Sequence, residues 1–536
     1  MDSKCGRHSE GFLAAFLLLL LLWVLCIMSF VTSVAEAQVL QLKHGFAELP
    51  GSSLRQEGKG MTAEHFGRLR SHDEMRRRRM LLAVVGFPLA GDGDPTSVGL
   101  YYTQVGLGTP VQLYYVQVDT GSDIMWVDCT PCYNCPLKTS LPIPLTVYDP
   151  SRSSTANVVP CSSQSCSLAT EMFSSTNCHG GVTECLYQSI YGDGSTIEGY
   201  FVEDLFTYDQ LVGNTSAPRN GSASVVFGCN FNQSGVLSST PRAVDGLIGF
   251  GQASISVLSQ LASKGITPNV FAHCLEGEDK GGGILVIGEI DEPDLIYTPI
   301  IQRQQHYNVQ LLNIAVNGMN ITSPSVFTLS DKSGGTGGGV IFDSGTTLAY
   351  LVDPAYTNFV TAITQVVPTP AQEVPDGEGG HQICFVDTGY DVNATFPDVT
   401  LYFDGGAMQL TPQNYLFQQE ITSTSGQTIA ADCLGWLESV SQPGYISYTI
   451  FGDIVLKDKL VVYDNEQHQI GWKNYDCKNS IKVSTTRNGS SPFTVNPTGL
   501  SPIGSFGQVN NPRRSLYTIM ALVTTLMLCW NLAIRM

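Results

Sequence analysis

Two stretches of the sequence decide the fold: Tyr115-Val116-Gln117-Val118-Asp119-Thr120-Gly121-Ser122 and Gly339-Val340-Ile341-Phe342-Asp343-Ser344-Gly345-Thr346. In each, an apolar run typical of a buried strand ends in Asp, a small hydroxyl residue, Gly and a second hydroxyl residue. Such a segment predicts a tight turn that displays a carboxylate, with glycine permitting the turn and the hydroxyls holding the carboxylate. Two matched turns indicate that Asp119 and Asp343 face each other and share a proton.

A third triplet, Asp387-Thr388-Gly389, shows that the triplet alone carries little information. Tyr390 follows it, so the second hydroxyl is missing, and Cys384 lies just upstream. We interpret Asp387 as part of a surface turn.

The segments downstream of the two complete turns also match. The first turn is followed at a distance by Asp245-Gly246-Leu247-Ile248-Gly249, and the second by Tyr448-Thr449-Ile450-Phe451-Gly452-Asp453. Each half therefore contains a strand, an aspartate turn, a long β-rich segment and then two apolar residues before Gly. This pattern is an internal repeat of one supersecondary plan.

These residues resemble those of the pepsin-like aspartic proteases, from about Gly99 to Cys477. The resemblance implies a mostly β, bilobal fold with a cleft between two β-rich lobes. It also implies that Asp119 and Asp343 are the catalytic pair and that no cofactor or metal is needed. The supporting residues would be Thr120, Gly121, Ser122, Ser344, Gly345 and Thr346.

The same resemblance extends to a hairpin flap. Trp126, seven residues after Asp119, matches the family Trp that bonds the flap tyrosine. Tyr191, Gly192 and Asp193 resemble the substrate-binding flap tip. Extra cysteines between the first turn and the flap are similar to those of the nepenthesin-like, plant-type branch, and the second half has no saposin-like insertion.

The composition agrees with a β-rich chain. Short apolar runs such as 224–228, 283–288 and 460–463 alternate with Gly, Ser, Asn and Pro clusters, which favours strands. Helices are expected at 256–264 and 354–366. The net charge of −19 excludes a nucleic-acid-binding protein, because phosphate binding needs clustered cations, and it suits an enzyme that works at acidic pH.

The first 80 residues predict two segments that precede the lobes. An apolar run with basic residues before it and Ala35-Glu36-Ala37 after it makes 1–37 a secretory signal peptide, the alternative being a signal anchor. Residues 38–80 end in four arginines, 76–79, and are either a solvated basic run or the propeptide of a zymogen, which the family resemblance favours. The N-terminal lobe is expected at 81–295 and the C-terminal lobe at 296–480.

The other end of the chain predicts a membrane attachment. Residues 481–515 are rich in Asn, Ser, Thr, Gly and Pro and are typical of a stalk, and 516–536 form an apolar tail. A transmembrane helix is one interpretation of the tail. The small residues and polar spacer before it favour a glycosylphosphatidylinositol (GPI) signal, with attachment at Ser505 or at a neighbouring Ser or Gly.

The cysteines predict an oxidising compartment. Three of the 15 lie in the signal or the tail, and an even set of twelve remains, which predicts six disulfides. The family resemblance implies one pair, Cys384–Cys433. The other pairings stay open, as does a metal knuckle at Cys129, Cys132 and Cys135. The unassigned cysteines are Cys129, Cys132, Cys135, Cys161, Cys166, Cys178, Cys185, Cys229, Cys274 and Cys477.

Six sequons permit N-glycosylation, at Asn214, Asn220, Asn232, Asn320, Asn393 and Asn488. Together these features predict a monomeric, secreted and GPI-anchored aspartic endopeptidase that acts on polypeptides at the outer face of the plasma membrane. The alternatives are a catalytically silent pepsin-like binding or inhibitor protein and an adhesive glycoprotein. The histidines of the expected lobes are scattered without metal-binding spacing, and packing or solvation suffices to explain them.

Overall fold

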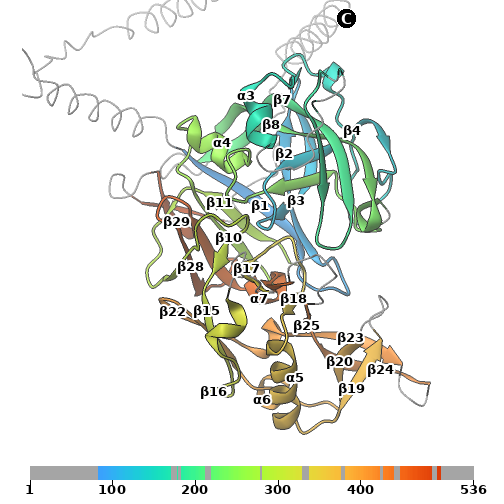
Figure 1. Ribbon diagram of the computed structural model, residues 1–536, viewed down its shortest axis with the longest axis vertical. Helices are drawn as coiled ribbons and strands as arrows, with labels where there is room; N and C mark the ends of the chain where they lie inside the picture. The colour runs from blue at the N-terminus through green and yellow to red at the C-terminus, as the bar shows by residue number, and fades with distance from the viewer. Residues whose placement is uncertain are drawn as a thin grey trace, which may run out of the picture. The chain divides into compact units, whose positions relative to one another are not determined.

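Both aspartate turns lie at strand ends in a mostly β structure (Figure 1). The computed structural model describes residues 83–496, except 171–177, 179–180, 182, 212–218, 239, 278–280, 329–336, 376–380, 423–425, 440–446 and 486–491. These residues all belong to the unit His72–Met536. The predicted signal peptide, the predicted propeptide, the GPI tail, Ser505, Asn214 and Asn488 lie outside the described residues.

The largest sheet has 14 strands and draws on both halves of the chain. Its order is β13-β28-β27-β10-β11-β1-β2-β3-β9-β4-β8-β7-β5, with β6 paired to β7. The strands are β1 (Val84–Asp92), β2 (Leu100–Leu107), β3 (Gln112–Asp119), β4 (Met125–Tyr133), β5 (Asn157–Val158), β6 (Leu186–Ile190), β7 (Thr196–Leu211), β8 (Arg219–Ser234), β9 (Gly246–Gly249), β10 (Val270–Leu275), β11 (Gly283–Ile287), β13 (Ile296–Pro299), β27 (Lys459–Asp464) and β28 (Gln469–Asn474).

Four smaller sheets complete the β structure. Their orders are β14-β17-β26-β18-β25, β16-β15-β21-β22, β19-β20-β24-β23 and β12-β29-β30. The strands are β12 (Glu289–Ile290), β14 (Asn308–Val309), β15 (Leu311–Val316), β16 (Met319–Asn320), β17 (Gly337–Phe342), β18 (Ala349–Leu351), β19 (Ala371–Pro375), β20 (His381–Val386), β21 (Val399–Phe403), β22 (Gly406–Leu410), β23 (Leu416–Thr422), β24 (Thr428–Leu434), β25 (Trp436–Glu438), β26 (Ser447–Phe451), β29 (Ile481–Ser484) and β30 (Phe493–Val495).

The helices are short, and both predicted ones are confirmed. The α-helices are α3 (Gln164–Thr170), α4 (Val257–Ser263), α5 (Ala355–Val366), α6 (Val392–Thr395) and α7 (Asp453–Leu456), and the 3₁₀ helices are η1 (Pro150–Arg152), η2 (Gly235–Ser238), η3 (Pro324–Phe327) and η4 (Pro412–Asn414). α4 begins after Ser256, whose side chain accepts a hydrogen bond from the Ser259 N–H and so satisfies one unpaired donor of the first turn. Among the described residues, no helix is both long enough and apolar enough to span a bilayer.

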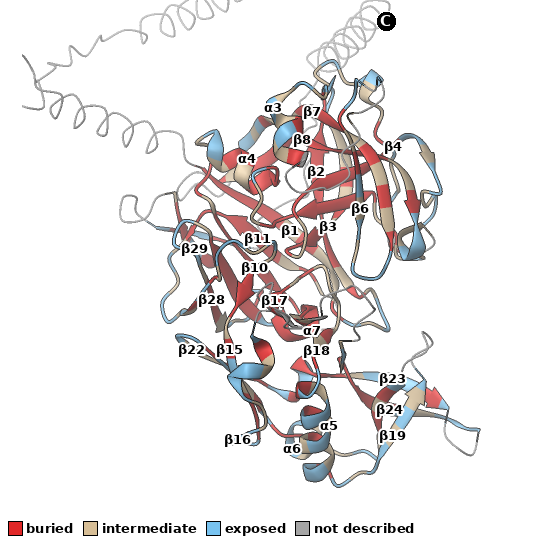
Figure 2. Cartoon of the chain, viewed as in Figure 1, coloured by how far each residue is buried: buried red, intermediate tan, exposed pale blue. Residues whose placement is uncertain are grey.

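The two halves meet where β10 pairs with β27 in antiparallel register. Phe271 of β10 stacks on Tyr463 of β27 with ring centroids 4.5 Å apart, and all six residues of each strand are buried. Figure 2 shows that much of the neighbouring β1 and β11 is also buried. Burial of apolar side chains is the main stabilising contribution to such a sheet. Strands of both predicted lobes therefore share one packed layer.

The structure differs from the expected stalk over its first residues. β29 and β30 pair with each other, and β29 also pairs with β12, within 481–495. Ile481, Val483, Phe493 and Val495 are buried in the core cluster beside Cys274–Cys477. These apolar residues alternate with polar ones at a period of two, which is typical of a strand. The mainly polar composition of the segment made this pattern easy to miss. The segment that could act as a stalk is therefore shorter than predicted.

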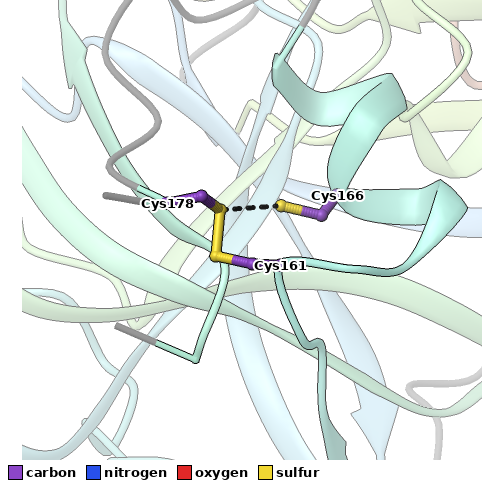
Figure 3. A group of neighbouring side chains, drawn as sticks. All are labelled: Cys161, Cys166 and Cys178. Carbon is purple, nitrogen blue, oxygen red and sulfur yellow. Dashed lines mark hydrogen bonds between the residues drawn. A yellow bond between two sulfur atoms is a disulfide. The ribbon is translucent and has the colours of Figure 1, made fainter. Parts of the chain in front are cut away.

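Six disulfides are formed, as the cysteine count predicts. They are Cys129–Cys229, Cys132–Cys135, Cys161–Cys178, Cys166–Cys185, Cys274–Cys477 and the expected Cys384–Cys433. Figure 3 shows Cys161, Cys166 and Cys178 close together, with the sulfur atoms of Cys166 and Cys178 3.7 Å apart. A cysteine binds metal as a thiolate. Cys161, Cys166 and Cys178 are all in disulfides, and so are Cys129, Cys132 and Cys135 of the possible metal knuckle.

Candidate active site

The two aspartates are placed by the repeated strand plan. β3 ends at Asp119 and runs parallel to β9, so that Asp119 pairs with Gly249. β17 ends at Phe342, next to Asp343, and runs parallel to β26, so that Phe342 pairs with Phe451. The two downstream apolar segments thus form the strands that lie beside the aspartate turns.

The turns are locked together through their second residues. The Thr120 hydroxyl donates to the Phe342 carbonyl at 3.2 Å and accepts from the Ser344 N–H at 3.0 Å. In the opposite direction, the Ser344 hydroxyl donates to the Val118 carbonyl at 3.2 Å, and the Thr120 N–H donates to that hydroxyl at 3.3 Å. Thr120 and Ser344 are almost fully buried, so water does not compete for these bonds. The four bonds fix the spacing of the aspartates.

Each carboxylate is held inside its own turn. The Gly121 N–H donates to Asp119 Oδ1 at 2.7 Å, and the Gly345 N–H donates to Asp343 Oδ1 at 2.8 Å. The Ser122 hydroxyl donates to Asp119 Oδ2, and the Thr346 hydroxyl donates to Asp343 Oδ2 at 2.6 Å. The hydroxyl bonds expected from the sequence are therefore present on both turns.

The two glycines serve a different purpose from the one that the sequence suggested. Neither Gly121 nor Gly345 has a positive φ. A Cβ added to Gly121 would instead overlap the Asp343 carboxyl group, and one added to Gly345 would overlap that of Asp119. Glycine is needed here because it lets the opposing carboxyl group approach closely.

The third triplet shows the opposite use of glycine. Asp387 precedes a turn in which Gly389 has a φ of 84° and donates its N–H to Asp387 Oδ1 at 2.7 Å. A Cβ on Gly389 would meet nothing within 4 Å. The prediction of a surface turn is confirmed.

Burial and a neighbouring charge perturb Asp119. Burial raises the pKa of the Asp119 carboxyl well above its usual range, and the charge of Asp343 raises it further. The hydrogen bonds from Ser122 and Gly121 act in the opposite direction, because they stabilise the ionised form. The Asp119 carboxyl therefore keeps its proton to a higher pH than an exposed aspartate does.

The predicted flap residues meet the first turn. Tyr191 follows β6, and its backbone closes a tight tip with Ser195 through a 2.9 Å hydrogen bond from the Tyr191 N–H to the Ser195 carbonyl. The Trp126 indole donates to the Tyr191 hydroxyl at 2.7 Å, as expected from the sequence. Burial, and then the charge of Asp119, raises the pKa of Tyr191, so its hydroxyl stays protonated. Gly192 and Asp193 lie at the tip between them, where Asp193 accepts a hydrogen bond from the Ser195 N–H.

A third buried carboxyl group near the pair was not predicted. Asp453 follows Gly452 at the end of β26, is 1% exposed, and begins α7. Burial raises its pKa well above the usual range, and the charges of Asp343 and Asp119 raise it further. Its position directly after the repeated apolar-apolar-Gly segment was the available signal.

Two further side chains contact the turns from outside. His306 Nδ1 lies 2.9 Å from the Gly121 carbonyl oxygen, and Gln117 Nε2 donates to the Gly345 carbonyl at 3.3 Å. His306 was among the histidines for which the sequence analysis expected only packing or solvation. Nothing in its local sequence indicates this contact, since Gly121 is far away in the chain.

Comparison with known families divides the chain into two matched regions. Residues 101–289 match a family model described as xylanase inhibitor N-terminal, and residues 306–474 match one described as xylanase inhibitor C-terminal.

The curated relatives described next are named aspartic proteinases, whereas the two family models are described as xylanase inhibitor. Aspartic proteinase 36 from Arabidopsis thaliana is 42% identical over 77% of this chain and 82% of its own length. Aspartic proteinase 39 from the same plant is 37% identical over 81% of this chain and 85% of its own length. Aspartic proteinase nepenthesin-2 from Nepenthes gracilis is 31% identical over 72% and 79% of the two chains.

Solved structures share the fold at low identity. Basic 7S globulin from soybean has a TM-score of 0.55 at 22% identity, covering 74% of this chain and 97% of its own. The structure titled edgp has a TM-score of 0.57 at 18% identity, covering 74% and 96%. The predicted mostly β, bilobal pepsin-like fold is confirmed.

Proposed function

Because the chain belongs to the pepsin-like plant aspartic proteinase family, we propose that it is an active aspartic endopeptidase that hydrolyses polypeptides at acidic pH. The observation that carries this proposal is the construction of the Asp119–Asp343 pair. Each carboxyl group receives a glycine N–H and a hydroxyl, and each glycine leaves room for the opposite carboxyl group.

The chemistry follows from one proton shared by two carboxyl groups. The ionised member accepts a proton from a water molecule, whose oxygen then attacks the scissile carbonyl carbon, while the protonated member donates to the carbonyl oxygen. The result is a tetrahedral gem-diol. Transfer of a proton to the amide nitrogen breaks the C–N bond and releases a carboxylic acid and an amine, without a covalent enzyme intermediate.

The flap supplies substrate contact in this proposal. Tyr191, held by Trp126, would fold over the substrate backbone and exclude bulk water from the reacting carbonyl. Gly192 and Asp193 would present the flap backbone to the peptide. The bonds from Ser122 and Thr346 favour an ionised carboxylate despite burial, and that ionised form is the base that the reaction needs.

We place this activity outside the cell. The signal-like first 37 residues, six disulfides and six sequons support a secreted glycoprotein, and the apolar tail supports a GPI anchor on the plasma membrane. Asn220, Asn320 and Asn393 are exposed, as glycan attachment requires, whereas Asn232 is half-buried. Release of the protein from intact cells by a phosphatidylinositol-specific phospholipase C tests the anchor, and retention after treatment argues for a transmembrane tail.

A second candidate is a pepsin-like binding or inhibitor protein without activity. The match to family models described as xylanase inhibitor favours it. The presence of both aspartates and both supporting hydroxyls favours the enzyme, since a binding protein has no need of a shared-proton pair.

Acidic digestion of a peptide library by the purified, matured protein separates the two. The enzyme is expected to cleave peptides between about pH 3 and 6, with inhibition by pepstatin, and Asp119→Asn is expected to lose that cleavage. Asp387→Asn, in the exposed third turn, is the matched control and should cleave like the wild type. Absence of pepstatin-sensitive cleavage by the wild type refutes the proposed activity, and full activity of Asp119→Asn refutes the site assignment.

A further inference from the structure

The first aspartate turn has a titratable contact that the mechanism above does not use. His306 lies between β13 and β14, and its Nδ1 is 2.9 Å from the Gly121 carbonyl oxygen. A carbonyl oxygen only accepts hydrogen bonds, so Nδ1 carries the proton in this contact. The Gly121 N–H in turn donates to Asp119 Oδ1 at 2.7 Å. The imidazole therefore holds Gly121, and the Gly121 N–H in turn holds the Asp119 carboxylate.

The backbone around His306 is held by several hydrogen bonds, and its ring packs against Tyr448. The His306 carbonyl accepts from Gln252 Nε2 at 2.7 Å, and the neighbouring Tyr307 hydroxyl donates to the Phe250 carbonyl at 2.8 Å. Phe250 donates its own N–H to the Asp119 carbonyl at 2.7 Å. The imidazole also meets the Tyr448 ring edge to face, with centroids 5.6 Å apart. A side chain anchored in this way is built into the site and does not lie there by chance.

The equivalent contact on the second turn cannot titrate. The Gly345 carbonyl accepts from the side-chain amide of Gln117 at 3.3 Å. Both turns thus have a donor on the glycine carbonyl, but only the donor on the first turn can gain a positive charge. An imidazole becomes charged as the pH falls through the weakly acidic range, whereas an amide stays neutral.

The neighbours of this imidazole include one charged group. Asp123, buried and one residue beyond Ser122, interacts electrostatically with His306, and its Oδ1 accepts from the Ala253 N–H at 2.8 Å. Tyr448 is the ring neighbour. The Asp119 carboxyl lies beyond the Gly121 peptide, so His306 acts on it through that peptide.

We propose that His306 is a positioning residue that orients the Asp119 turn through the Gly121 carbonyl. This inference rests on the proposed protease function. It predicts that removal of the donor lowers kcat, because the turn loses its anchor. It also predicts that a neutral donor in place of the imidazole restores most of kcat, because the bond to the Gly121 carbonyl is kept.

Two substitutions separate the donor from the ring. His306→Asn keeps a donor at the position of Nδ1 without the ring, and His306→Phe keeps the ring against Tyr448 without a donor. We expect His306→Phe to lower kcat about tenfold, the effect of one lost hydrogen bond, with KM little changed. We expect His306→Asn to recover most of kcat, which a purely structural role of the ring would not allow. His381→Asn, an exposed histidine on β20, is the control and should leave kcat and the pH profile unchanged.

A second readout does not depend on turnover. In protein labelled with ¹⁵N-histidine, neutral His306 should show the proton on Nδ1. A neutral Nε2–H tautomer, or wild-type kcat and pH profile in both His306 variants, overturns the inference. If the wild type cleaves no peptide while the Nδ1–H tautomer is observed, the proposed function fails and the contact on the turn stands as structural only.

Discussion

The two aspartate turns have matching internal hydrogen bonds but different neighbouring side chains. Inside, each aspartate receives one glycine N–H and one hydroxyl, and Thr120 and Ser344 exchange equivalent bonds across the pair. Outside, the first turn meets a histidine and lies under the flap, whereas the second meets a glutamine and lies near a third buried carboxyl group. The internal likeness explains how two carboxyl groups share a proton, and the external difference gives each aspartate its own electrostatic surroundings.

The largest expected effect comes from filling the space that brings the pair together. Gly121→Ala and Gly345→Ala should each lower kcat about 1000-fold or more, because the new methyl group displaces the opposite carboxyl group. Peptide hydrolysis at acidic pH measures this. Gly389→Ala is the contrasting control: it should cost about 1 kcal/mol of stability at its positive φ and leave kcat unchanged. Wild-type kcat in Gly121→Ala would show that the close approach is not required.

A smaller effect is expected from the hydroxyls inside the turns. Ser122→Ala removes a donor that lowers the pKa of Asp119, so the pKa should rise and the acidic limb of the pH profile should move to higher pH. We expect kcat to fall about tenfold. Thr346→Val makes the same change on the second turn. Unequal shifts of the acidic limb in the two variants would measure how far the outer surroundings separate the aspartates, and unshifted limbs in both would contradict the proposed role of the hydroxyls.

A still smaller effect should follow from the neutral donor on the second turn. Gln117→Leu removes the 3.3 Å bond to the Gly345 carbonyl, and we expect kcat to fall about threefold without a shift of the pH profile. The steady-state pH profile measures both quantities. A fall in kcat as large as that expected for His306→Phe would contradict the difference expected between the donors of the two turns.

The smallest effect concerns stability near the first turn. Burial raises the pKa of Asp128 to about 7 and that of Asp245 to about 6. Because the folded pKa values exceed those of the unfolded chain, the folded state binds more protons, and stability falls as the pH rises from about 4 to about 7. Asp128→Asn should reduce the difference in unfolding free energy between these pH values by about 1–2 kcal/mol. Denaturant titrations at both pH values measure it, and an unchanged difference would refute the assignment.

Much of the site could be predicted because its signals are local in sequence. The aspartates and their hydroxyls follow from short repeated motifs, and the Trp126–Tyr191 bond was implied by the family resemblance. The sequence predicted that the glycines permit the turn, but not that Gly121 and Gly345 make room for the opposite carboxyl group. A glycine in a turn and a glycine against a distant carboxyl group look identical in sequence, although only Gly389 among these three has a positive φ.

The missed features depend on contacts between distant segments. His306 and Gln117 act on glycine carbonyls of the opposite half, and no local pattern marks them. The Cys129–Cys229 and Cys274–Cys477 pairings likewise depend on which distant segments become neighbours. The strands at 481–484 and 493–495 are too short to stand out from a polar background.

The pairing of β10 with β27 also determines how much of the chain must be synthesised before the sheet is complete. A chain leaves the ribosome N-terminus first, and its early segments begin to fold before the rest has been made. Here the sheet that carries the first aspartate turn gains its last partners, β27 and β28, only from residues 459–474. The Thr120 hydroxyl likewise cannot accept its hydrogen bond from the Ser344 N–H until Ser344 has been synthesised. An unfinished chain would therefore lack the paired carboxyl groups, and nascent fragments of this proposed protease would be harmless to the compartment that makes them.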